Sequence, residues 1–376
     1  MIKKSSDDGK DPHSPQSKTA FVERASRRMV DLASQLVWGP EGNGRHFDQL
    51  TDLIEKYLAA GEDRVIERAL ERAPDFRVYD EIVNDVLNCI EWQTTGGVNA
   101  EPTDLILFAV PLHLLLYAQD DKVAVPWNLP LVDTLAKSFR QHGLVGQAPT
   151  VLLYNYLYSF AELEPLPYSK RYCLPQRILK TLGNSSPVDL FQHYDYIALA
   201  PGEAHLLLRF IVGLVLQAPE ERQPFTDAAE DEDSYLERIS GWTSAFAREV
   251  ERQLQRPELE VICFNSLPAL LQAALQDGHH QHRELTLQML ISQAIDENGG
   301  ADALSAFIVL PTDQPVLTLI LTDKERGVQV LYYPWQLAPW DEPDAIFASI
   351  GTALDQAGIE DIQWGEQPPH RLPYLH

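Results

Sequence analysis

The stretch LSAFIVLPTDQPVLTLILTDKERGVQVLY, Leu304–Tyr332, contains three short apolar runs separated by turn residues. The runs Leu304–Leu310, Val316–Leu321 and Val328–Tyr332 each predict a β-strand, because strand-forming residues dominate them. The last two runs are joined by Thr322–Gly327, which predicts a hairpin loop with its glycine at a positive φ. The stretch therefore indicates a sheet built from consecutive strands.

Helices are expected to alternate with strands around this stretch. Downstream, Asp344–Ala357 predicts a helix and Ile359–Trp364 a further strand. Two earlier segments have the same order. In the first, a helix stopped by Gly143 lies between the predicted strands Leu105–Val110, ended by Pro111, and Thr150–Tyr158. In the second, a helix at 235–255 lies between the predicted strands Leu206–Leu216 and Leu259–Phe264. Strand–helix–strand order in triplicate predicts a layered α/β region, so the fold class is α/β with mixed α+β character.

The N-terminal part has a different, helical pattern. Val22, Ala25, Met29, Leu32 and Leu36 recur at spacings of three and four, which predicts an amphipathic helix ended by Gly39-Pro40. Three more helices are expected before residue 97. The predicted organisation is a disordered tail at 1–19, an α-helical section at 20–97, a first α/β region at 98–225 and a second, acidic α/β region at 226–376.

Two of the predicted helices carry recognisable terminal signals. Ser234 and Glu237 have the spacing of a capping box, and the acidic run Glu230–Asp233 lies where the helix macrodipole favours negative charge. The later helix is preceded by Asp341 and followed by Gly358. The acidic run has a second interpretation, as a docking site for a basic partner.

Charge and composition exclude several classes of protein. The 376 residues carry a formal net charge of −25, which disfavours direct binding to nucleic acid or to anionic membranes. Residues 1–200 carry 20 Lys+Arg and 27 Asp+Glu, a net of −7, whereas residues 201–376 carry 10 and 28, a net of −18. No apolar run reaches the roughly 20 residues needed to span a bilayer. The acidic half either keeps the protein soluble or binds a basic partner.

The three cysteines and the N-terminus indicate a cytoplasmic protein. Cys89, Cys173 and Cys263 are far apart and lack the spacing of a metal site, which predicts reduced thiols. The first residues have no apolar core of the kind found in a secretory signal peptide.

A histidine-rich segment, Asp277–Glu284, is the strongest candidate for chemistry. It contains His279, His280 and His282, but no pair among them and Glu284 reproduces the spacing of a zinc motif. Because Gly278 interrupts the apolar pattern, the favoured interpretation is a solvated connection between two helices. The alternatives are a metal or catalytic role and a pH-sensitive contact.

The remaining polar motifs favour structural roles. His113 is expected to be a satisfied core histidine, and Gly39–Arg45 a helix-terminating turn, since no strand precedes it as a phosphate-binding loop requires. His193, Asp195 and His205 permit an acid–base site, although loop packing is favoured because no nucleophile accompanies them. The sequence thus predicts no catalytic residue, no cofactor and no metal ligand.

An aromatic and proline-rich stretch, Tyr332–Trp340, offers contact area. It holds Tyr332, Tyr333, Trp335 and Trp340 with two prolines, and is predicted to form a stiff connection after a strand. Packing as a lid over its own domain is favoured, with a protein-binding surface and a ligand groove as alternatives. The proline-rich segment 368–376 predicts no regular element.

The order of several segments resembles a known family. VYDEIVNDVLNCIE, DLILFAVPLHLL, LVDTLAKSFRQHGLV and APTVLLYNYLYSFAEL follow one another as in an uncharacterised family of β-proteobacterial proteins of unknown function. The resemblance covers residues 25–165 and, more loosely, the C-terminal part. It implies a bacterial cytoplasmic origin and a mixed α/β fold, and no activity or catalytic residues.

These observations favour a non-catalytic cytoplasmic interaction protein, an adaptor or assembly partner that uses acidic and aromatic–proline surfaces. Its partner is expected to be a protein, and a basic protein is the option that the acidic charge suggests. One alternative is an enzyme whose site is assembled from His193, Asp195, His205 and His279–His282. Another is an acidic mimic of nucleic acid that blocks a DNA-binding protein, which requires the carboxylates to form a stripe on one face.

Overall fold

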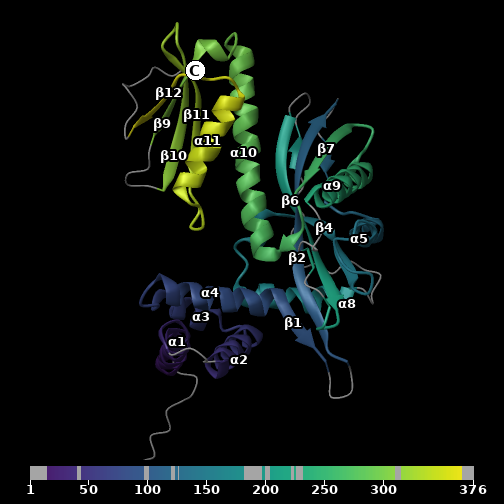
Figure 1. The fold of residues 1–376 in the computed structure, drawn as a ribbon, viewed down its shortest axis with the longest axis vertical. Helices are drawn as coiled ribbons and strands as arrows, with labels where there is room; N and C mark the ends of the chain where they lie inside the picture. Colours follow the sequence, from purple (N-terminus) through teal and green to yellow (C-terminus); the bar gives the residue numbers. More distant parts are fainter. Residues whose placement is uncertain are drawn as a thin grey trace, which may run out of the picture. The chain divides into compact units, whose positions relative to one another are not determined.

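The computed structural model describes residues 15–39, 44–96, 101–119, 123–125, 127–181, 197–199, 204–221, 224–225, 232–309 and 315–365. The protein has a mixed α+β fold with antiparallel and mixed sheets (Figure 1). It divides into two compact units. Unit 1 contains residues 1–112, 117–203 and 209–274, and unit 2 contains residues 113–116, 204–208 and 275–376.

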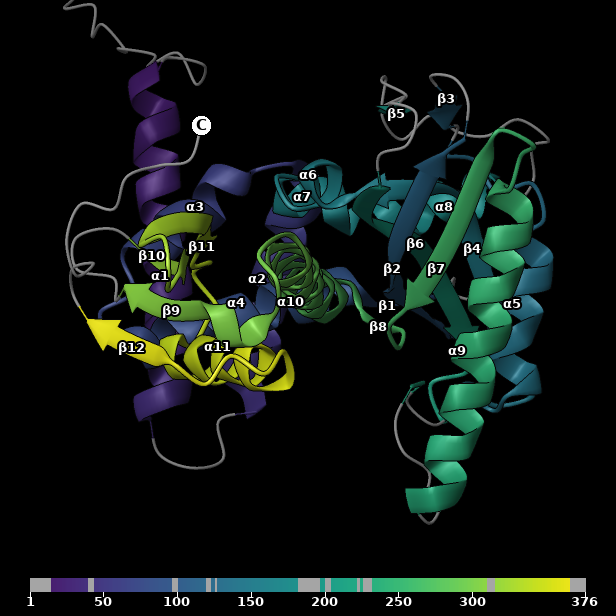
Figure 2. The same cartoon turned by 90° about the horizontal axis from the view of Figure 1, so that it is seen from above.

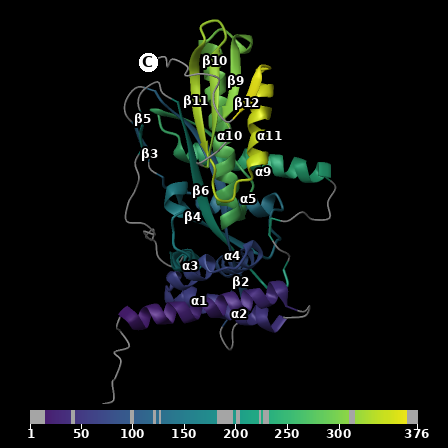
Figure 3. The same ribbon diagram turned by 90° about the vertical axis from the view of Figure 1, so that its left-hand side faces the viewer.

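Unit 1 begins with a helical layer, as the apolar stripes predict (Figure 3). Its helices are α1 (Pro15–Trp38), α2 (Gly44–Ala60), α3 (Asp63–Glu71) and α4 (Phe76–Glu91). Helix α1 begins inside the predicted tail 1–19, and residues 1–14 of that prediction lie outside the described residues. Asp75 caps α4 by accepting from the amides of Arg77 and Val78, which satisfies two of the donors that every helix start leaves unpaired.

The larger sheet of unit 1 has the strand order β1-β2-β6-β4, with β7 and β8 also paired to β2. The strands are β1 (Trp92–Thr95), β2 (Thr103–Ala118), β4 (Thr150–Ser159), β6 (Ala204–Gln217), β7 (Leu259–Asn265) and β8 (Ala269–Leu270). Short β3 (Val123–Val125) and β5 (Ile197–Leu199) form a two-stranded sheet. The helices are α5 (Val132–Gln141), α6 (Phe160–Leu163), α7 (Tyr168–Tyr172), α8 (Leu174–Thr181) and α9 (Glu232–Leu254). The alternation along the chain is therefore as predicted, although β1 and β8 pair antiparallel with β2, and β4 antiparallel with β6.

Two local predictions in unit 1 are wrong. Pro111 does not end its strand, because β2 continues to Ala118 and the Pro111 carbonyl accepts a hydrogen bond from the Ser266 amide at 3.0 Å. Ser234 does not begin a capping box, because α9 already starts at Glu232. The predicted apolar face of α9 is confirmed, with Trp242 and Phe246 fully buried.

A dense aromatic core fixes the sheet of unit 1 against α5 and α9. Phe139 makes edge contacts with Phe108, Trp242 and Phe246 at centroid distances of 5.5, 5.3 and 5.8 Å. The Trp242 indole donates to the Ser138 hydroxyl at 3.1 Å, so its buried N–H is satisfied. Such aromatic pairs contribute roughly 0.5–1.5 kcal/mol each beyond their buried area.

Gly213→Ala is expected to destabilise unit 1 by about 2–3 kcal/mol in urea unfolding. A Cβ at position 213 on β6 would lie 2.5 Å from Phe108 and 2.8 Å from Leu153, and overpacking of a tight core costs energy. The matched control is Gly351→Ala, where a Cβ meets nothing within 4 Å in a helix, and alanine there should stabilise by about 0.5–1 kcal/mol. Equal effects at the two positions would contradict the packing argument.

Unit 2 is a four-stranded sheet with helices on one face (Figure 2). The strands β9 (Leu304–Val309), β10 (Val316–Asp323), β11 (Val328–Gln336) and β12 (Ile362–Gly365) have the order β11-β10-β9-β12, with only the β9–β12 pair parallel among these. Its helices are the 27-residue α10 (Leu271–Glu297), the short 3-10 turn η1 (Ala301–Ala303) and α11 (Pro343–Gln356). Gly327 and Gly358 have φ of 63° and 76°, which confirms the predicted hairpin and helix end.

The core of unit 2 lies between this sheet and the two helices. It is formed by Leu287, Ile291, Ala294, Leu304, Ala306, Ile308, Leu317, Leu319, Leu321, Trp335, Ile346, Ile350, Ala353, Leu354 and Ile359. These residues alternate along each strand, so the residues between them lie on the face turned away from α10 and α11.

Candidate functional site

The histidine segment lies on a continuous helix, so its interpretation as a solvated connection is wrong. Helix α10 runs unbroken through Gly278, His279, His280 and His282. A glycine inside a helix costs only about 1 kcal/mol, and the packing of both halves of a long helix easily outweighs that cost. Each of the three histidines is partly buried.

Two histidines from distant parts of the chain stack in unit 2. The rings of His113, on β2, and His282 have centroids 6.0 Å apart and planes inclined by 16°. His113 is 1% exposed, and its Nε2 donates to the Gly278 carbonyl of α10 at 3.2 Å. The prediction of a satisfied core histidine at 113 is therefore confirmed. Its stacking partner was not expected.

The histidines of α10 differ in the direction in which their pKa values are shifted. Burial, with Arg283 nearby, lowers the pKa of His279 to about 4. Burial, with His113 and His279 nearby, lowers the pKa of His282 to about 4, and burial also lowers the pKa of His113. These three imidazoles are neutral at pH 7. In contrast, a hydrogen bond with Glu284 at 3.2 Å raises the pKa of His280.

A buried ion pair fixes α10 to the sheet of unit 2. Arg283 donates two hydrogen bonds to Asp341, at 2.7 and 2.8 Å, and one to the Gln336 carbonyl at 2.7 Å. The side chains of Arg283 and Asp341 are 9% and 3% exposed. The guanidinium also lies 5.0 Å above the Trp335 ring. This pair was not predicted from the sequence, although Arg283 belongs to the histidine segment and Asp341 precedes a predicted helix.

These groups form no metal site among the residues that the structure describes. Across the part of the chain that the structure describes, no group of three or more His, Cys, Asp or Glu is arranged to hold a metal ion. His193 and Asp195 of the predicted acid–base alternative lie outside the described residues. His205 belongs to unit 2, as do His113 and His282. The ring contact within this group is the one between His113 and His282. The part of the acid–base alternative formed by His193 and Asp195 stays untested.

The aromatic stretch Tyr332–Trp340 is not a connection in its first half. Strand β11 continues to Gln336, so Tyr332, Tyr333 and Trp335 are strand residues. Trp335 is fully buried and Tyr333 packs against it in the core, whereas Tyr332 is 52% exposed on the opposite face. The lid hypothesis therefore does not describe this part of the stretch.

The face of the unit 2 sheet that is turned away from α10 and α11 has an unusual composition. This outer face consists of Ser305, Phe307, Val309, Val316, Thr318, Ile320, Thr322, Gln329, Tyr332, Pro334, Gln336 and Gln363. Tyr332 and Phe307 flank Ile320 across three strands. None of these twelve residues is charged, whereas the described part of unit 2 holds 13 carboxylates against 3 basic side chains, a net of −10.

A second exposed group of aromatic side chains lies on the helical layer of unit 1. This aromatic patch comprises Trp38, Phe76 and Tyr79, which are 57%, 76% and 42% exposed, together with Arg77. Phe76 and Tyr79 stack with their planes inclined by 20°, and the Arg77 guanidinium lies 5.1 Å over the Trp38 ring. Trp, Tyr and Arg are the residue types enriched where proteins bind one another.

A buried polar group in unit 1 joins α4, α7 and α10. Glu91, which is 7% exposed, accepts a hydrogen bond from the Gln272 amide in the first turn of α10 at 2.5 Å. Arg171 donates to the Gln272 side chain at 2.7 Å and to the Glu164 carbonyl at 2.6 Å. Burial raises the pKa of Glu91 to about 7, against the opposing effects of the Gln272 amide and Arg171.

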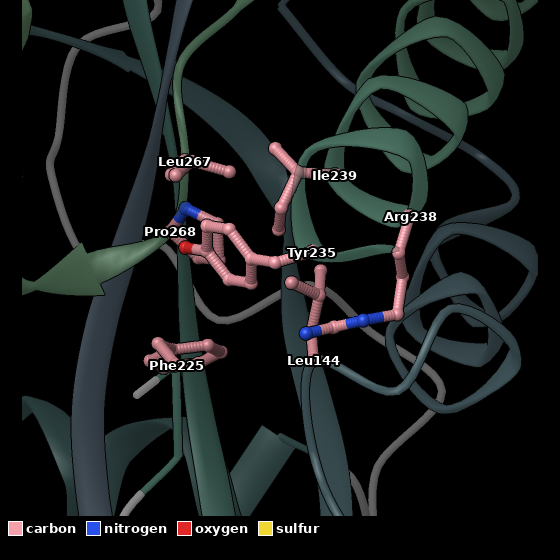
Figure 4. Close-up of a pocket in the computed structure, with 7 residues that line it drawn as sticks. All are labelled: Leu144, Phe225, Tyr235, Arg238, Ile239, Leu267 and Pro268. Carbon is pink, nitrogen blue, oxygen red and sulfur yellow. The ribbon is translucent and has the colours of Figure 1, made fainter. Parts of the chain in front are cut away.

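A small cavity lies where α9 meets the sheet of unit 1 (Figure 4). It is lined by Leu144, Phe225, Tyr235, Arg238, Ile239, Leu267 and Pro268. Its volume of about 10 Å³ is the space that one water needs, so it holds no organic ligand. Arg238 donates to the His142 carbonyl at 3.0 Å, and Phe225 has a φ of 62°. Phe225 packs on Phe108 with ring centroids 4.9 Å apart, so its strained backbone accompanies core packing.

The other sequence predictions give no site. Cys89, Cys173 and Cys263 are free thiols, with Cys89 and Cys263 buried. The predicted turn Gly39–Arg45 follows the end of α1, and residues 40–43 lie outside the described residues. Segment 368–376 also lies outside them. None of the described helices is long and apolar enough to cross a membrane.

The family resemblance of residues 25–165 stays a prediction. Comparison of the chain with models of protein families, with curated proteins and with solved structures found no match.

Proposed function

We propose that this protein is a non-catalytic adaptor or assembly partner of the cytoplasm, and that it binds a basic protein through the outer face of the unit 2 sheet. The observation that carries the proposal is the absence of charge on the twelve residues of that face, within a described region of net −10. An antiparallel sheet with one solvated face normally alternates apolar core residues with polar or charged ones.

The composition of the outer face is that of a contact surface. Its centre contains Phe307, Ile320 and Tyr332, which are adjacent across three strands. Ile320 is only 4% exposed, so Tyr332 and the partly exposed Phe307 on either side of it supply the accessible area. Tyrosine combines a large apolar area with a polar end, and charged residues are depleted at the centre of protein interfaces. Tyr332 is half-exposed and so is available to a partner. It is the expected hot spot.

The surrounding charge supports a basic partner. Carboxylates outnumber basic side chains by 13 to 3 in the described part of unit 2. Such a field speeds the approach of a cationic protein and repels nucleic acid. It also repels a second copy of this chain, since the whole sequence carries −25.

An adaptor needs two contact surfaces, and the aromatic patch of unit 1 supplies a second. Phe76 is 76% exposed, although it is large and apolar. The three free thiols support a reducing compartment such as the cytoplasm.

The test is site-specific cross-linking followed by reconstitution. A photoreactive phenylalanine analogue is placed at Tyr332 in the native host, and in a second strain at Gln288, an exposed position of α10. We expect a discrete adduct with a basic protein at position 332 and none at 288. The captured protein, once purified, should bind the full chain, with an affinity that falls as salt is raised.

Substitutions then decide whether the outer face is responsible. Tyr332→Lys should weaken binding about 10- to 100-fold, because a hot-spot truncation costs about 2 kcal/mol and the new charge repels a basic partner. Gln288→Lys makes the same change of charge in the same unit and should leave binding unchanged. Equal losses of affinity from the two variants would show that binding is simple charge attraction and not the work of the outer face. A captured partner that normally binds DNA, and whose binding to this chain is competed by DNA, would replace the adaptor proposal with nucleic-acid mimicry.

A further inference from the structure

The stacked histidines of unit 2 connect a strand to the middle of a helix without an ion pair between them. His113 is fully buried on β2, and its only hydrogen bond described is donated to the Gly278 carbonyl. His282 stacks on it from one turn further along α10. The buried Nδ1 of His282 has no hydrogen-bond partner among the described residues. At neutral pH the stack is formed by two uncharged rings, because burial lowers the pKa of both.

The groups around the stack add positive charge under acidic conditions. His279 disfavours a charge on His282, and Arg283, also on α10, disfavours a charge on His279. His280 acts on His279 in the same sense, while Asp341, which precedes α11, opposes it. Asp341 is already bound by Arg283 through two hydrogen bonds, and Glu284 is bound by His280 and Ser349. These two carboxylates therefore have other partners, and among the described contacts neither forms a hydrogen bond or ion pair with His113 or His282.

We propose that the stacked pair of His113 and His282 is an acid-sensitive latch that holds residues 113–116 of β2 on α10 and releases them when both rings are protonated. Two imidazolium ions at the observed centroid distance of 6.0 Å repel each other. Protonated His113 also has to be accommodated at a site that is 1% exposed. The contact between the two rings therefore stabilises unit 2 at neutral pH and destabilises it in acid.

The sign of the effect follows from the titration of the folded chain. The pKa values of His113, His279 and His282 lie below the ordinary value of 6.5 in the folded protein. The unfolded chain therefore takes up protons first as the pH falls. The contribution of the latch is complete above pH 6.5 and is lost between pH 6.5 and about 4.

The experiment uses the full chain and follows both the rings and the backbone. Histidine side chains are titrated by NMR from pH 7.5 to 4, and backbone protection is measured by hydrogen exchange at pH 7 and pH 5. We expect His113 and His282 to titrate together, below the histidines other than His279. Protection factors of residues 113–116 should fall about 10-fold or more at pH 5, since one pH unit corresponds to a factor of 10. Protection of residues 105–110, on the same strand but in unit 1, should stay within a factor of two or three.

Variants separate the latch from general acid sensitivity. His282→Phe retains a stacking ring that cannot be protonated, and should remove most of the loss of protection at pH 5. His282→Gln replaces the ring at a partly buried position by a polar side chain that cannot be protonated. It should raise the pKa of His113 toward its ordinary value. His46→Phe, at a histidine of unit 1, is the matched control and should leave the behaviour of residues 113–116 unchanged. An ordinary titration of His282, or an equal loss of protection in the His282→Phe protein, would overturn the proposal.

Discussion

Replacing Arg283 by methionine is expected to lower the free energy of unfolding of unit 2 by about 3–5 kcal/mol, the usual cost of removing one partner of a buried ion pair. Methionine fills most of the arginine volume, so the loss reports the charge and not a cavity. Asp341, with its side chain 3% exposed, would keep only the Ala338 amide at 2.7 Å among the hydrogen bonds described. Burial alone raises the pKa of Asp341, and the bonds from Arg283 and Ala338 more than reverse this. Without Arg283 the pKa should rise.

Hydrogen exchange of β10 as a function of urea measures this loss, because β10 is the central strand of unit 2 and reports its unfolding separately from unit 1. The matched control is Arg326→Met, the same change at a 67% exposed arginine of unit 2 whose ion pair with Asp323 is 3.7 Å long. Because the arginine of this long pair is exposed to solvent, the pair is expected to contribute about 0–1 kcal/mol. The double variant Arg283→Met with Asp341→Leu should recover part of the loss, since it no longer buries an unpaired carboxylate. A single variant as stable as the Arg326→Met control would contradict the role given to this pair.

The sequence alone was enough to predict local structure where one residue type determines the backbone conformation. The hairpin after β10 needs a residue at positive φ, and glycine adopts it without steric cost, so Gly327 could be placed from the sequence alone. The helix end at Gly358 follows in the same way. The stripes of α1 to α4 could be predicted because burial of one helix face requires residues three and four apart.

Proline and glycine led to wrong element boundaries at positions where tertiary contacts, and not local preference, determine whether a strand or helix continues. Pro334 lies within β11, which is the edge strand of the unit 2 sheet, and an edge strand tolerates a residue that has no N–H to donate. Gly278 lies within α10, where the buried residues on both sides hold the helix together. In both cases the residue is unfavourable locally and is compensated by partners that are remote in sequence.

The candidate groups were unpredictable because their members are far apart along the chain. His113 contacts a carbonyl 165 residues away, and Glu91 contacts an amide 181 residues away. Both residues read as ordinary members of apolar segments. The outer face of the unit 2 sheet is different, because alternate residues of the strands in 304–336 can be assigned to the same face from the sequence. Knowledge of which face the helices cover was the missing information.

Glu91→Ala is expected to destabilise unit 1 by about 2–4 kcal/mol at pH 5, because it leaves a buried amide at the start of α10 without its acceptor and creates a cavity. Glu91→Gln retains an oxygen that can accept from the Gln272 amide, as the carboxyl group of Glu91 does at 2.5 Å. At pH 5 we therefore expect this variant to lie within about 1 kcal/mol of the parent. Urea unfolding followed by hydrogen exchange in α4 measures both effects.

The pH dependence of the same pair of variants tests the environment of the carboxyl group. The pKa of Glu91 is raised from 4.5 to about 7, so its contribution to stability is complete below pH 4.5 and is lost as the pH rises to about 7. Glutamine cannot titrate, and Glu91→Gln should therefore gain about 2–3 kcal/mol relative to the parent between pH 5 and pH 8. Glu67→Gln, at an exposed carboxylate of α3, is the matched control and should show the pH dependence of the parent. If Glu91→Gln and the parent instead stay parallel from pH 5 to pH 8, Glu91 is ionised throughout and stabilises α10 as a charged N-terminal cap.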